Sequence, residues 1–564
     1  MRRILLLVVV LLQACAVNEG VDPDATTSTT TRGATTTLPF DEETRLQALD
    51  TTGRFVEAVL DGDGFTAASL STDPPATVEE EIDAWATAIG LESASYTIES
   101  ETFTATTAEI GVRLNLELLE VGHWAYSTTV SLVGGGPWSV LWSPSVLHPS
   151  LEAGDVVRVD RQWLPRAPIL ARDGTELAGV EPVKVIGVVP AWVEDLEVVQ
   201  DELLRLAGID PEVVTTEISR PAVQPDWFVP VGTVKSVVYA AVGDEIEALP
   251  GVIARDGSER LPFRDDFASH LIGSTGPITA EQLDELGYPY GPTDVIGQTG
   301  IEAAFESQLA GRPRTAVVRV NKFGRVVEEL HVVEAVEPSP VQTTIDVDVQ
   351  TAVEQVLDDD ERRLAVVVLD APSGQVLATA SRPLDDGFDR ARLGAYPPGS
   401  TFKIVTASGL LDRGYGPDTE IECPGDVDLG GRVFRNASDL DLGVVTFETA
   451  FARSCNTSFA SAAVGDLDDD ALRDVAERFG FNSEPAAGVP AATPAFPDPV
   501  DTTELAAAAI GQGRVVVSPM HMASVAGAVG PRAGGPPNVI CAPPPWPGLD
   551  RGRAGGGDQR ARKL

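Results

Sequence analysis

The apolar residues of this chain stand in short runs whose spacing changes repeatedly along the sequence, and this pattern constrains the fold more than any other feature. Helical spacing gives way to alternation, and alternation gives way again to helical spacing. A chain of 564 residues with such changes is long enough for about three or four domains. The sequence therefore predicts a multidomain α+β protein.

The segment 41–149 is predicted to be an α+β domain in which helices precede strands. Its start carries apolar residues at helical spacing, whereas 108–118 and 127–133 alternate. Alternation near its end places Trp138, Val140 and Trp142 on one face of a last strand. A core strand filled by aromatic side chains explains these residues completely, so the residues alone assign no chemistry to this segment.

The middle of the chain is predicted to be rich in sheet. Residues 151–338 hold many short Val- and Ile-rich runs broken by Pro and Gly, with helical insertions such as 302–309. Beyond them, a helix over 347–357 and a hairpin of strands 364–369 and 375–380 begin a further α+β region. Helical spacing dominates the rest of that region.

The charge balance bears on the partners of the protein. The chain has 41 Lys and Arg against 85 Asp and Glu, which gives a formal net charge of −44. Nucleic-acid binding needs a basic surface, so we expect no nucleic-acid partner. A hydrophobic content of 43% is ordinary for globular proteins, and solvation of a folded surface explains the acidic residues.

Cysteine and histidine spacing gives no sign of a metal site. The four cysteines Cys15, Cys423, Cys455 and Cys541 form no CxxC pair, and no two histidines stand at the spacing of a helical metal site. No lysine follows a glycine, so a P-loop is absent. We predict neither a metal nor a cofactor, and a disulfide between Cys423 and Cys455 remains open.

The first fifteen residues are predicted to be a lipoprotein signal peptide. Two arginines precede the apolar run Ile4–Leu12, which is too short to cross about 30 Å of hydrocarbon. The run ends in Leu-Gln-Ala-Cys, which resembles a bacterial lipobox, whose cysteine becomes lipidated. We therefore expect a lipid on Cys15 and a protein held at the extracytoplasmic face of the membrane, within the bacterial cell envelope. An ordinary signal peptide cut near Ala14 or Ala16 is the alternative.

A flexible linker is predicted to follow this signal. Residues 16–40 are rich in Thr, with Pro, Gly and Asp but no apolar period, so they cannot bury enough surface to fold. Such a linker separates the first domain from the membrane by some tens of Å.

The segment Pro397-Pro398-Gly399-Ser400-Thr401-Phe402-Lys403 places a serine immediately before a helical run. Lys403 follows Ser400 by three residues, on the same helical face, so its amine can reach the hydroxyl. Burial and the positive helix end would lower the lysine pKa and let it act as a base toward the serine. A helix-capping serine with a surface lysine is the plainer interpretation. However, Lys403 is the only one of the five lysines with a serine three positions before it.

Ser454-Cys455-Asn456 is the only Ser-x-Asn sequence in the chain. In a loop between helices, its hydroxyl and carboxamide can relay a proton and hold a substrate amide. Alone it would indicate a turn, but after the Ser-x-x-Lys motif it belongs to a pattern.

These motifs, in this order, resemble those of the class B penicillin-binding proteins, which are peptidoglycan D,D-transpeptidases with the fingerprint SxxK, SxN and KTG. The Trp-x-Val-x-Trp-x-Pro-Ser sequence near residue 145 looks like the nuclear-transport-factor-like (NTF2-like) domain of the low-affinity, β-lactam-resistance branch. The likeness extends from residue 41 to about 529. Other segments similar to the family are Arg166–Gly174, His270–Gly273, Gly297–Glu302, Leu309–Gly311, Thr344–Asp346 with Gln350, Gly511–Gly513 and Ser518–Met520.

The resemblance implies a fold for each region. Residues 41–149 would form the NTF2-like domain, 151–338 a sheet-rich dimerisation (pedestal) domain, and 340–530 a transpeptidase domain of the serine β-lactamase-like kind. The fold class expected is thus multidomain α+β.

The resemblance also implies acyl transfer. Ser400 would attack the carbonyl between two D-alanines of a peptidoglycan stem peptide, with Lys403 as base, and its backbone N–H would form half of an oxyanion hole. Ser454 and Asn456 would relay the proton and position the peptide. β-Lactams would acylate the same serine as covalent inhibitors, and a glycosyltransferase partner is compatible with the resemblance.

The third motif of the family is not found. No Lys-Thr-Gly or Lys-Ser-Gly occurs, so we expect an incomplete transpeptidase domain of impaired activity.

The composition changes abruptly over 531–564, a Gly-, Pro- and Arg-rich stretch that we interpret as a shifted reading frame, with a natural disordered tail as the alternative. A non-catalytic cell-wall scaffold or β-lactam-binding sensor, and less strongly a β-lactamase-like hydrolase, are the other functions considered.

Overall fold

The computed structural model describes residues 42–72, 78–134, 137–358, 360 and 362–530. They form two compact units. The first unit comprises the described residues up to 164, with 277–295 and 312–337; the second comprises 165–276, 296–311 and the described residues from 338. The predicted multidomain α+β organisation is confirmed. The lipobox with Cys15, the linker 16–40 and the stretch 531–564 lie outside the described residues.

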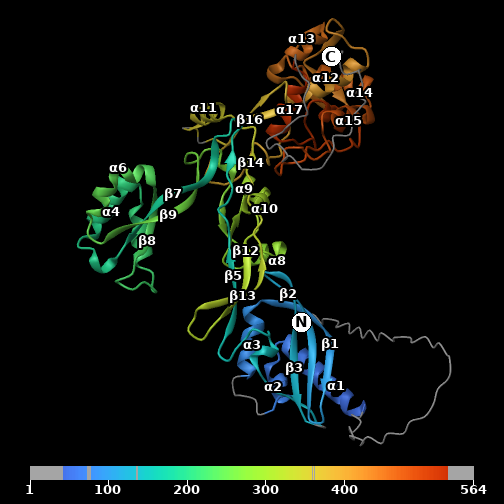
Figure 1. Ribbon diagram of the computed structural model, residues 1–564. Helices are drawn as coiled ribbons and strands as arrows, with labels where there is room; N and C mark the ends of the chain where they lie inside the picture. The colour runs from blue at the N-terminus through green and yellow to red at the C-terminus, as the bar shows by residue number, and fades with distance from the viewer. Residues whose placement is uncertain (1–41, 73–77, 135–136, 359, 361, 531–564) are drawn as a thin grey trace, which may run out of the picture. The chain divides into compact units, whose positions relative to one another are not determined.

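The first unit opens with helices and continues with an antiparallel sheet, as predicted (Figure 1). Every second residue of the second strand is buried, from Ala108 to Leu118, so one face of the sheet packs against the helices. The elements are α1 (Glu42–Leu60), α2 (Gly64–Ser69), α3 (Val78–Ala88), β1 (Leu91–Phe103), β2 (Thr107–Leu118), β3 (Gly122–Val133) and β4 (Ser139–Val140), in the sheet order β1-β2-β3-β4.

The last strand of this sheet is shorter than the alternation predicted. β4 covers two residues, and a 3₁₀ turn over Pro144–Val146 follows it. The Leu141 N–H still donates to the Ser131 carbonyl at 2.8 Å, and Ser143 then caps the 3₁₀ turn, so sheet pairing ends before Pro144. Trp138 and Val140 are nevertheless buried, and Trp142 is half-buried against the same core.

A second sheet of the first unit shares this core. It has the order β13-β12-β5, formed by β13 (Val326–Val333), β12 (Arg314–Val320) and β5 (Val156–Gln162). Val157 of β5 and Val317 of β12 lie in one hydrophobic cluster with Phe55 of α1 and Trp124 of β3. The apolar core of the first unit is therefore continuous across both sheets.

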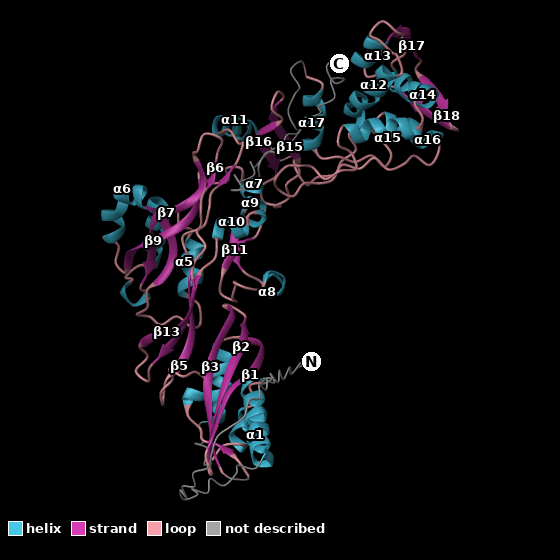
Figure 2. Ribbon diagram, turned by 45° about the vertical axis from the view of Figure 1, so that its right-hand side comes forward, coloured by secondary structure: helices cyan, strands magenta, loops and turns pink. Residues whose placement is uncertain are grey.

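The second unit begins with a sheet built around one long strand. β7 (Glu176–Val188) pairs with both β8 (Val229–Lys235) and β9 (Val252–Pro262) (Figure 1). The far end of this sheet adds β6 (Ile169–Leu170), labelled near β7 in Figure 2, and β14 (Val341–Gln342). The helices that pack on β7, β8 and β9 are α4 (Leu196–Ala207), α5 (Pro211–Ile218) and α6 (Ser236–Glu247).

The helix predicted over 302–309 is present in two pieces, α9 (Gly300–Ala304) and α10 (Glu306–Ala310), with a break at Phe305. Buried charges surround this break. Glu302 pairs with Arg166 at 2.7 Å and with Arg260 at 2.5 Å, and Arg166 also pairs with Glu306 at 2.8 Å. Buried ions of this kind require such partners.

The last part of the second unit agrees closely with the sequence pattern. α11 (Val347–Leu357), capped by the Asp346 carboxylate, precedes the antiparallel hairpin of β15 (Leu364–Asp370) and β16 (Gln375–Arg382). α17 (Pro519–Ala528) packs on β15.

A helical core follows the hairpin. The buried faces of α12 (Lys403–Asp412), α14 (Asn456–Asp466), α15 (Asp469–Arg478) and α16 (Thr502–Ala509) form one hydrophobic cluster. Short strands and one further helix extend from this core: β17 (Glu420–Cys423), β18 (Asp426–Leu429), β19 (Arg432–Arg435), β20 (Gly443–Thr446) and α13 (Phe447–Ala452).

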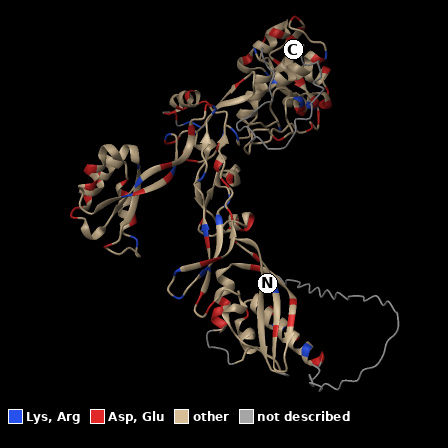
Figure 3. Cartoon of the chain, viewed as in Figure 1, with Lys and Arg blue, Asp and Glu red and all other residues tan. Residues whose placement is uncertain are grey.

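Two surface properties concern the setting of the protein. Acidic residues are spread along the described chain of both units (Figure 3). Among the described helices, none combines the length and the apolar character needed to span a bilayer.

Candidate active site

Ser400 lies exposed in a 3₁₀ turn, Gly399–Phe402, that leads directly into α12. Phe402, at the end of this turn, is fully buried between the rings of Phe481 and Phe496, at centroid distances of 5.4 and 5.6 Å. The buried ring anchors the turn to the core, so the neighbouring hydroxyl is held at the surface on a rigid support.

A distant glycine completes the support of this turn. The Gly399 N–H donates to the Gly511 carbonyl at 2.8 Å, and Gly511 has a φ of +69°. A Cβ at residue 511 would lie 2.1 Å from the Gly399 oxygen, so only glycine fits there. The sequence marked Gly511–Gly513 as a family-like segment, and the structure shows the physical need for its first residue.

Lys403, the first residue of α12, brings the predicted site residues together. Its Nζ lies 3.0 Å from Ser400 Oγ, 3.0 Å from Ser454 Oγ and 2.5 Å from Asn456 Oδ1. It also donates to the Ser454 carbonyl at 2.9 Å. Ser400, Lys403, Ser454 and Asn456 thus form one cluster, although 51 residues separate Lys403 from Ser454 in the sequence.

Burial lowers the pKa of Lys403 to about 8, because desolvation disfavours the charged amine. The side chain is 2% exposed. Two of its partners, the Ser454 carbonyl and Asn456 Oδ1, can only accept hydrogen bonds. A neutral amine has two N–H groups for these two acceptors and one lone pair left for a serine hydroxyl. The cluster therefore suits the neutral, basic form of Lys403.

Ser454 occupies a tight turn between α13 and α14, as the sequence predicted. Its φ of +54° is in the left-handed region, which costs about 1 kcal/mol or more for a residue with a side chain. This conformation lets the carbonyl and the hydroxyl of one residue both face the amine of Lys403. The strain is therefore located at a residue that contacts the base.

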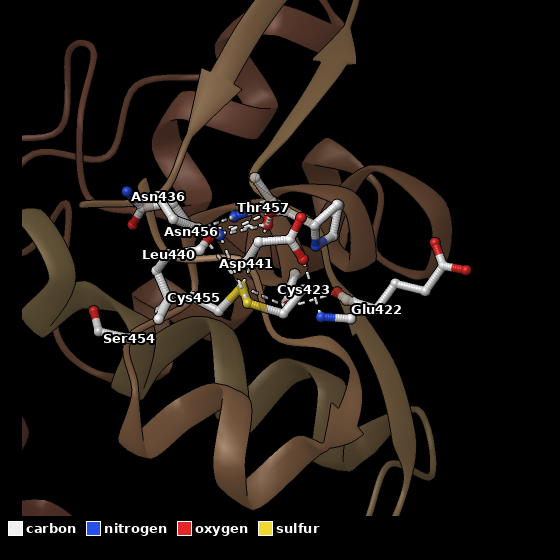
Figure 4. Close-up of a disulfide and its surroundings, with 12 residues drawn as sticks. Glu422, Cys423, Asn436, Leu440, Asp441, Ser454, Cys455, Asn456 and Thr457 are labelled. Atoms are coloured by element: carbon white, nitrogen blue, oxygen red, sulfur yellow. Dashed lines mark hydrogen bonds between the residues drawn. A yellow bond between two sulfur atoms is a disulfide. The ribbon is translucent and has the colours of Figure 1, made fainter. Parts of the chain in front are cut away.

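The residues around Asn456 are fastened to the end of β17. Cys455 and Cys423 form a disulfide, both fully buried, which the sequence had left open (Figure 4). Thr457 Oγ1 donates to the Pro424 carbonyl at 2.8 Å, and Ser458 Oγ donates to the Glu422 carbonyl at 2.6 Å. These three ties fix the first turn of α14 on both sides of Asn456.

Asn436 is a further structural residue of the site that sequence reasoning missed. Its buried amide donates to the Pro424 and Leu440 carbonyls, both at 2.8 Å, and accepts from the Thr457 N–H at 3.0 Å (Figure 4). A single Asn after a strand has no distinctive local signal, so only the spatial contacts reveal it. Asn456 is oriented similarly, because its Nδ2 donates to the Arg435 carbonyl at 3.0 Å and leaves Oδ1 for Lys403.

In the described part of the chain, no group of three His, Cys, Asp or Glu side chains is arranged to hold a metal ion. The chemistry open to this cluster is that of a hydroxyl nucleophile next to a buried amine.

Comparison with protein families gives three matches along the chain. The NTF2-like N-terminal transpeptidase domain matches residues 47–155, the penicillin-binding protein dimerisation domain residues 164–343, and the penicillin-binding protein transpeptidase domain residues 364–531. The boundaries at 149, 338 and 530 that we drew from the sequence stay predictions.

Individual relatives agree with these matches. Penicillin-binding protein 3 of Bacillus subtilis is 28% identical over 426 residues, which cover 69% of this chain and 61% of the relative. The peptidoglycan D,D-transpeptidase MrdA of Acinetobacter baumannii is 27% identical over 413 residues, covering 66% and 61%. The alignments thus span about three-fifths of these relatives.

A solved structure shows the same fold. The complex between penicillin-binding protein PBP2 and MreC from Helicobacter pylori matches with a TM-score of 0.51 and 19% identity, over 70% of this chain and 80% of the solved chain. At this identity the match concerns the fold alone. With an NTF2-like domain, a dimerisation domain and a transpeptidase domain in this order, the chain has the organisation of a class B penicillin-binding protein.

Proposed function

We propose that this protein is a penicillin-binding peptidoglycan D,D-transpeptidase that works through a serine acyl-enzyme. The observation that carries the proposal is the buried Lys403 amine, 3.0 Å from the hydroxyls of both Ser400 and Ser454. The names of relatives such as MrdA, a peptidoglycan D,D-transpeptidase, support the same reaction.

In the acylation step, neutral Lys403 accepts the Ser400 proton while Oγ attacks the carbonyl carbon between two D-alanines of a stem peptide. The C–O bond forms, and the carbonyl π electrons move to the oxygen, which the Ser400 N–H stabilises at the start of α12. The C–N bond then breaks, and the proton passes from Lys403 through the Ser454 hydroxyl to the leaving amine. The products are the acyl-enzyme and free D-alanine.

In the second step, an amine of a neighbouring peptidoglycan strand attacks the ester. Its proton returns through the same groups to Ser400, and a new peptide bond replaces the ester bond. A β-lactam would undergo only the first step. Attack by Ser400 breaks the amide C–N bond of its ring, but the nitrogen stays attached to the acyl group through the rest of the molecule and does not leave.

Asn456 has both of its polar atoms engaged, with Oδ1 on Lys403 and Nδ2 on the Arg435 carbonyl. We assign it two roles, to orient the amine of Lys403 and to position the peptide when a substrate amide arrives. The second role requires the substrate to compete with the Arg435 carbonyl.

The proposal also covers the acylation rate, the β-lactam affinity, the location and the partners of this protein. The family's KTG motif supplies a second oxyanion donor, and one such donor contributes about 10²–10³ in rate. The 564 residues contain no such motif, so we propose slow acylation by this chain. The low-affinity type of β-lactam binding, a lipid on Cys15, an extracytoplasmic location and a glycosyltransferase partner are proposed on the resemblance alone.

The test is intact-mass detection of a penicillin adduct on the purified chain. We expect an adduct that persists for hours, is lost in Ser400→Ala and is retained in Ser408→Ala, a serine of the same helix away from the Lys403 cluster. Rapid loss of the adduct would favour a β-lactamase-like hydrolase instead. A folded sample without any adduct would favour a non-catalytic scaffold and overturn the proposal.

A further inference from the structure

The first turn of α14 presents a second side chain to Lys403 besides Asn456. Phe459 follows Asn456 by three residues, so the two side chains share one face of the helix. The Lys403 amine lies over the Phe459 ring, with Nζ 5.8 Å from the ring centroid. This distance is within the range of about 6 Å over which the face of an aromatic ring attracts a cation.

The Phe459 ring is held in place by the rings around it. The side chain is fully buried, and its centroid lies 5.6 Å from that of Phe447 and 6.0 Å from that of Phe451. A side chain enclosed by close packing keeps one orientation. The ring that Lys403 contacts is therefore a fixed part of the site.

The proposed reaction creates a positive charge at this place. When the Lys403 amine accepts the Ser400 proton, it becomes an ammonium group on a side chain that is 2% exposed. The atoms that hydrogen-bond to it are uncharged, and within the described residues no carboxylate lies within 4.0 Å of Nζ. A buried charge without a counter-ion is costly, so the oxygen dipoles and the ring must stabilise it.

Arg390 shows how the same chain treats another buried cation that lies over a ring. Its guanidinium stands 5.6 Å from the Phe388 centroid, but it also pairs with the Asp386 carboxylate. Phe388 is 43% exposed, so water competes with its ring. Lys403 has no such counter-ion and Phe459 no such exposure, and a cation–π contact is stronger where the cation is desolvated.

We propose that Phe459 is a positioning residue whose ring stabilises the ammonium form of Lys403 that arises during acylation of Ser400. This inference rests on the proposed transpeptidase function and adds a group that acts only through the base. A Phe459 that merely filled space would not affect the charge on Lys403.

The test is the pH dependence of acylation by a fluorescent penicillin, measured on the full chain with fluorinated phenylalanines at residue 459. Fluorine draws electron density from the ring face, so the monofluoro, trifluoro and pentafluoro forms attract a cation progressively less while the shape changes little. The apparent pKa of the profile should fall stepwise along this series, by about one unit in total. The plateau rate should fall about threefold, because a weaker base takes the Ser400 proton less readily.

The same series at residue 447 is the matched control. Phe447 is buried in the same core and packs on Phe459, whereas among the described rings it is Phe459 that lies within cation–π range of Lys403. Fluorination at residue 447 should therefore leave the apparent pKa unchanged. Phe459→Leu, which removes the ring, should lower the apparent pKa about as far as the pentafluoro form does.

An apparent pKa that stays constant along the series at residue 459, or that falls equally along the series at residue 447, would overturn the proposal. Carbon-13 NMR titration of the ε-carbon of Lys403, one of five lysines, follows the same pKa without any acylation. A fall of the NMR pKa in a protein that never acylates Ser400 would contradict the proposed function while supporting the ring contact.

Discussion

Lys403 in the second unit and His148 in the first are both buried bases, yet their surroundings differ in kind. Burial lowers the pKa of each, to about 8 for Lys403 and to about 4 for His148. Lys403 has hydroxyl, carbonyl and amide oxygens around its amine. The His148 ring instead stacks on Trp124 at 5.4 Å and contacts the Tyr126 ring at 4.6 Å, with one polar contact from the Ser150 N–H at 3.2 Å.

The difference shows that a lowered pKa marks burial, whereas the partners decide what the base can do. Two of the groups around Lys403 are hydroxyls that can exchange protons with it, and one of them, on Ser400, is exposed to an incoming substrate. Of the rings around His148, that of Trp124 has no hydroxyl, and the Tyr126 hydroxyl donates to the Leu147 carbonyl instead. His331 stacks on Trp124 as well, at 6.0 Å, so the imidazoles help to join β3 to β13 within the first unit.

Replacement of Lys403 and of His148 should have the largest effects and tests whether the two buried bases differ in function. Lys403→Met should slow acylation of Ser400 by a β-lactam about 10²–10⁴-fold, the usual contribution of a general base. The remaining rate should lose its dependence on pH, whereas the rate of the unmodified protein should rise with pH and level off above about 8 as Lys403 becomes neutral. Stopped-flow labelling with a fluorescent penicillin measures both.

His148→Phe is the counterpart of this variant. Its acylation rate at neutral pH should equal that of the unmodified protein, because every hydrogen-bond partner of Lys403 belongs to the second unit. A loss comparable to that of Lys403→Met would show that the first unit takes part in acylation, and the contrast between the two bases would fail.

Removal of the disulfide sharpens the account of how the polar cluster is held. The double variant Cys423→Ala with Cys455→Ala should unfold about 2–4 kcal/mol more easily, because the crosslink spans 32 residues of the sequence. Acylation should fall less than about tenfold, since the Thr457 and Ser458 hydrogen bonds still fasten the first turn of α14. Urea unfolding and penicillin labelling give the two values.

Chemical reduction of the disulfide in the unmodified protein is the control, and it should lower stability and acylation as the double variant does. The same treatment should change neither value in the double variant, which has no disulfide to reduce. If acylation fell as far as in Lys403→Met, the disulfide rather than the hydrogen bonds would position Ser454 and Asn456.

The parts of the fold and site that the sequence could predict are those encoded by local spacing. Ser400 with Lys403, and Ser454 with Asn456, stand within one helical turn or one loop of each other, and the helix 347–357 with its following hairpin has a clear period. Asn436 and Gly511 were not predicted as site residues. Their contacts reach Thr457, 21 residues away, and Gly399 across more than a hundred residues, so no local pattern reports them.

Acid should destabilise the first unit through His148. Its folded pKa of about 4 lies below the unfolded value near 6.5, so the unfolded chain binds the proton more readily. The free energy of unfolding therefore falls as the pH drops from about 6.5 toward 4, by about 2 kcal/mol at pH 5. Burial also lowers the pKa of His331, which adds to this loss.

Urea unfolding at pH 7.5 and pH 5.0 tests this expectation. His148→Phe should lose less stability between the two pH values than the unmodified protein does. Lys403→Met should lose as much as the unmodified protein, because Lys403 is largely protonated over this range. If His148→Phe lost as much stability between pH 7.5 and pH 5.0 as the unmodified protein, then burial of a neutral His148 ring would not be the cause of the loss.

The smallest expected effect concerns Glu328, whose charge raises the pKa of His148 against the larger effect of burial. Glu328 accepts a hydrogen bond from Ser150 Oγ at 3.2 Å and is 42% exposed, so water screens its charge. Glu328→Gln should therefore lower the pKa of His148 further by only a few tenths of a unit, seen by NMR titration of the ring. A shift in the opposite direction, or one of a full unit or more, would mean that charge rather than desolvation controls this imidazole. In that case His148 would no longer serve as the purely buried counterpart of Lys403.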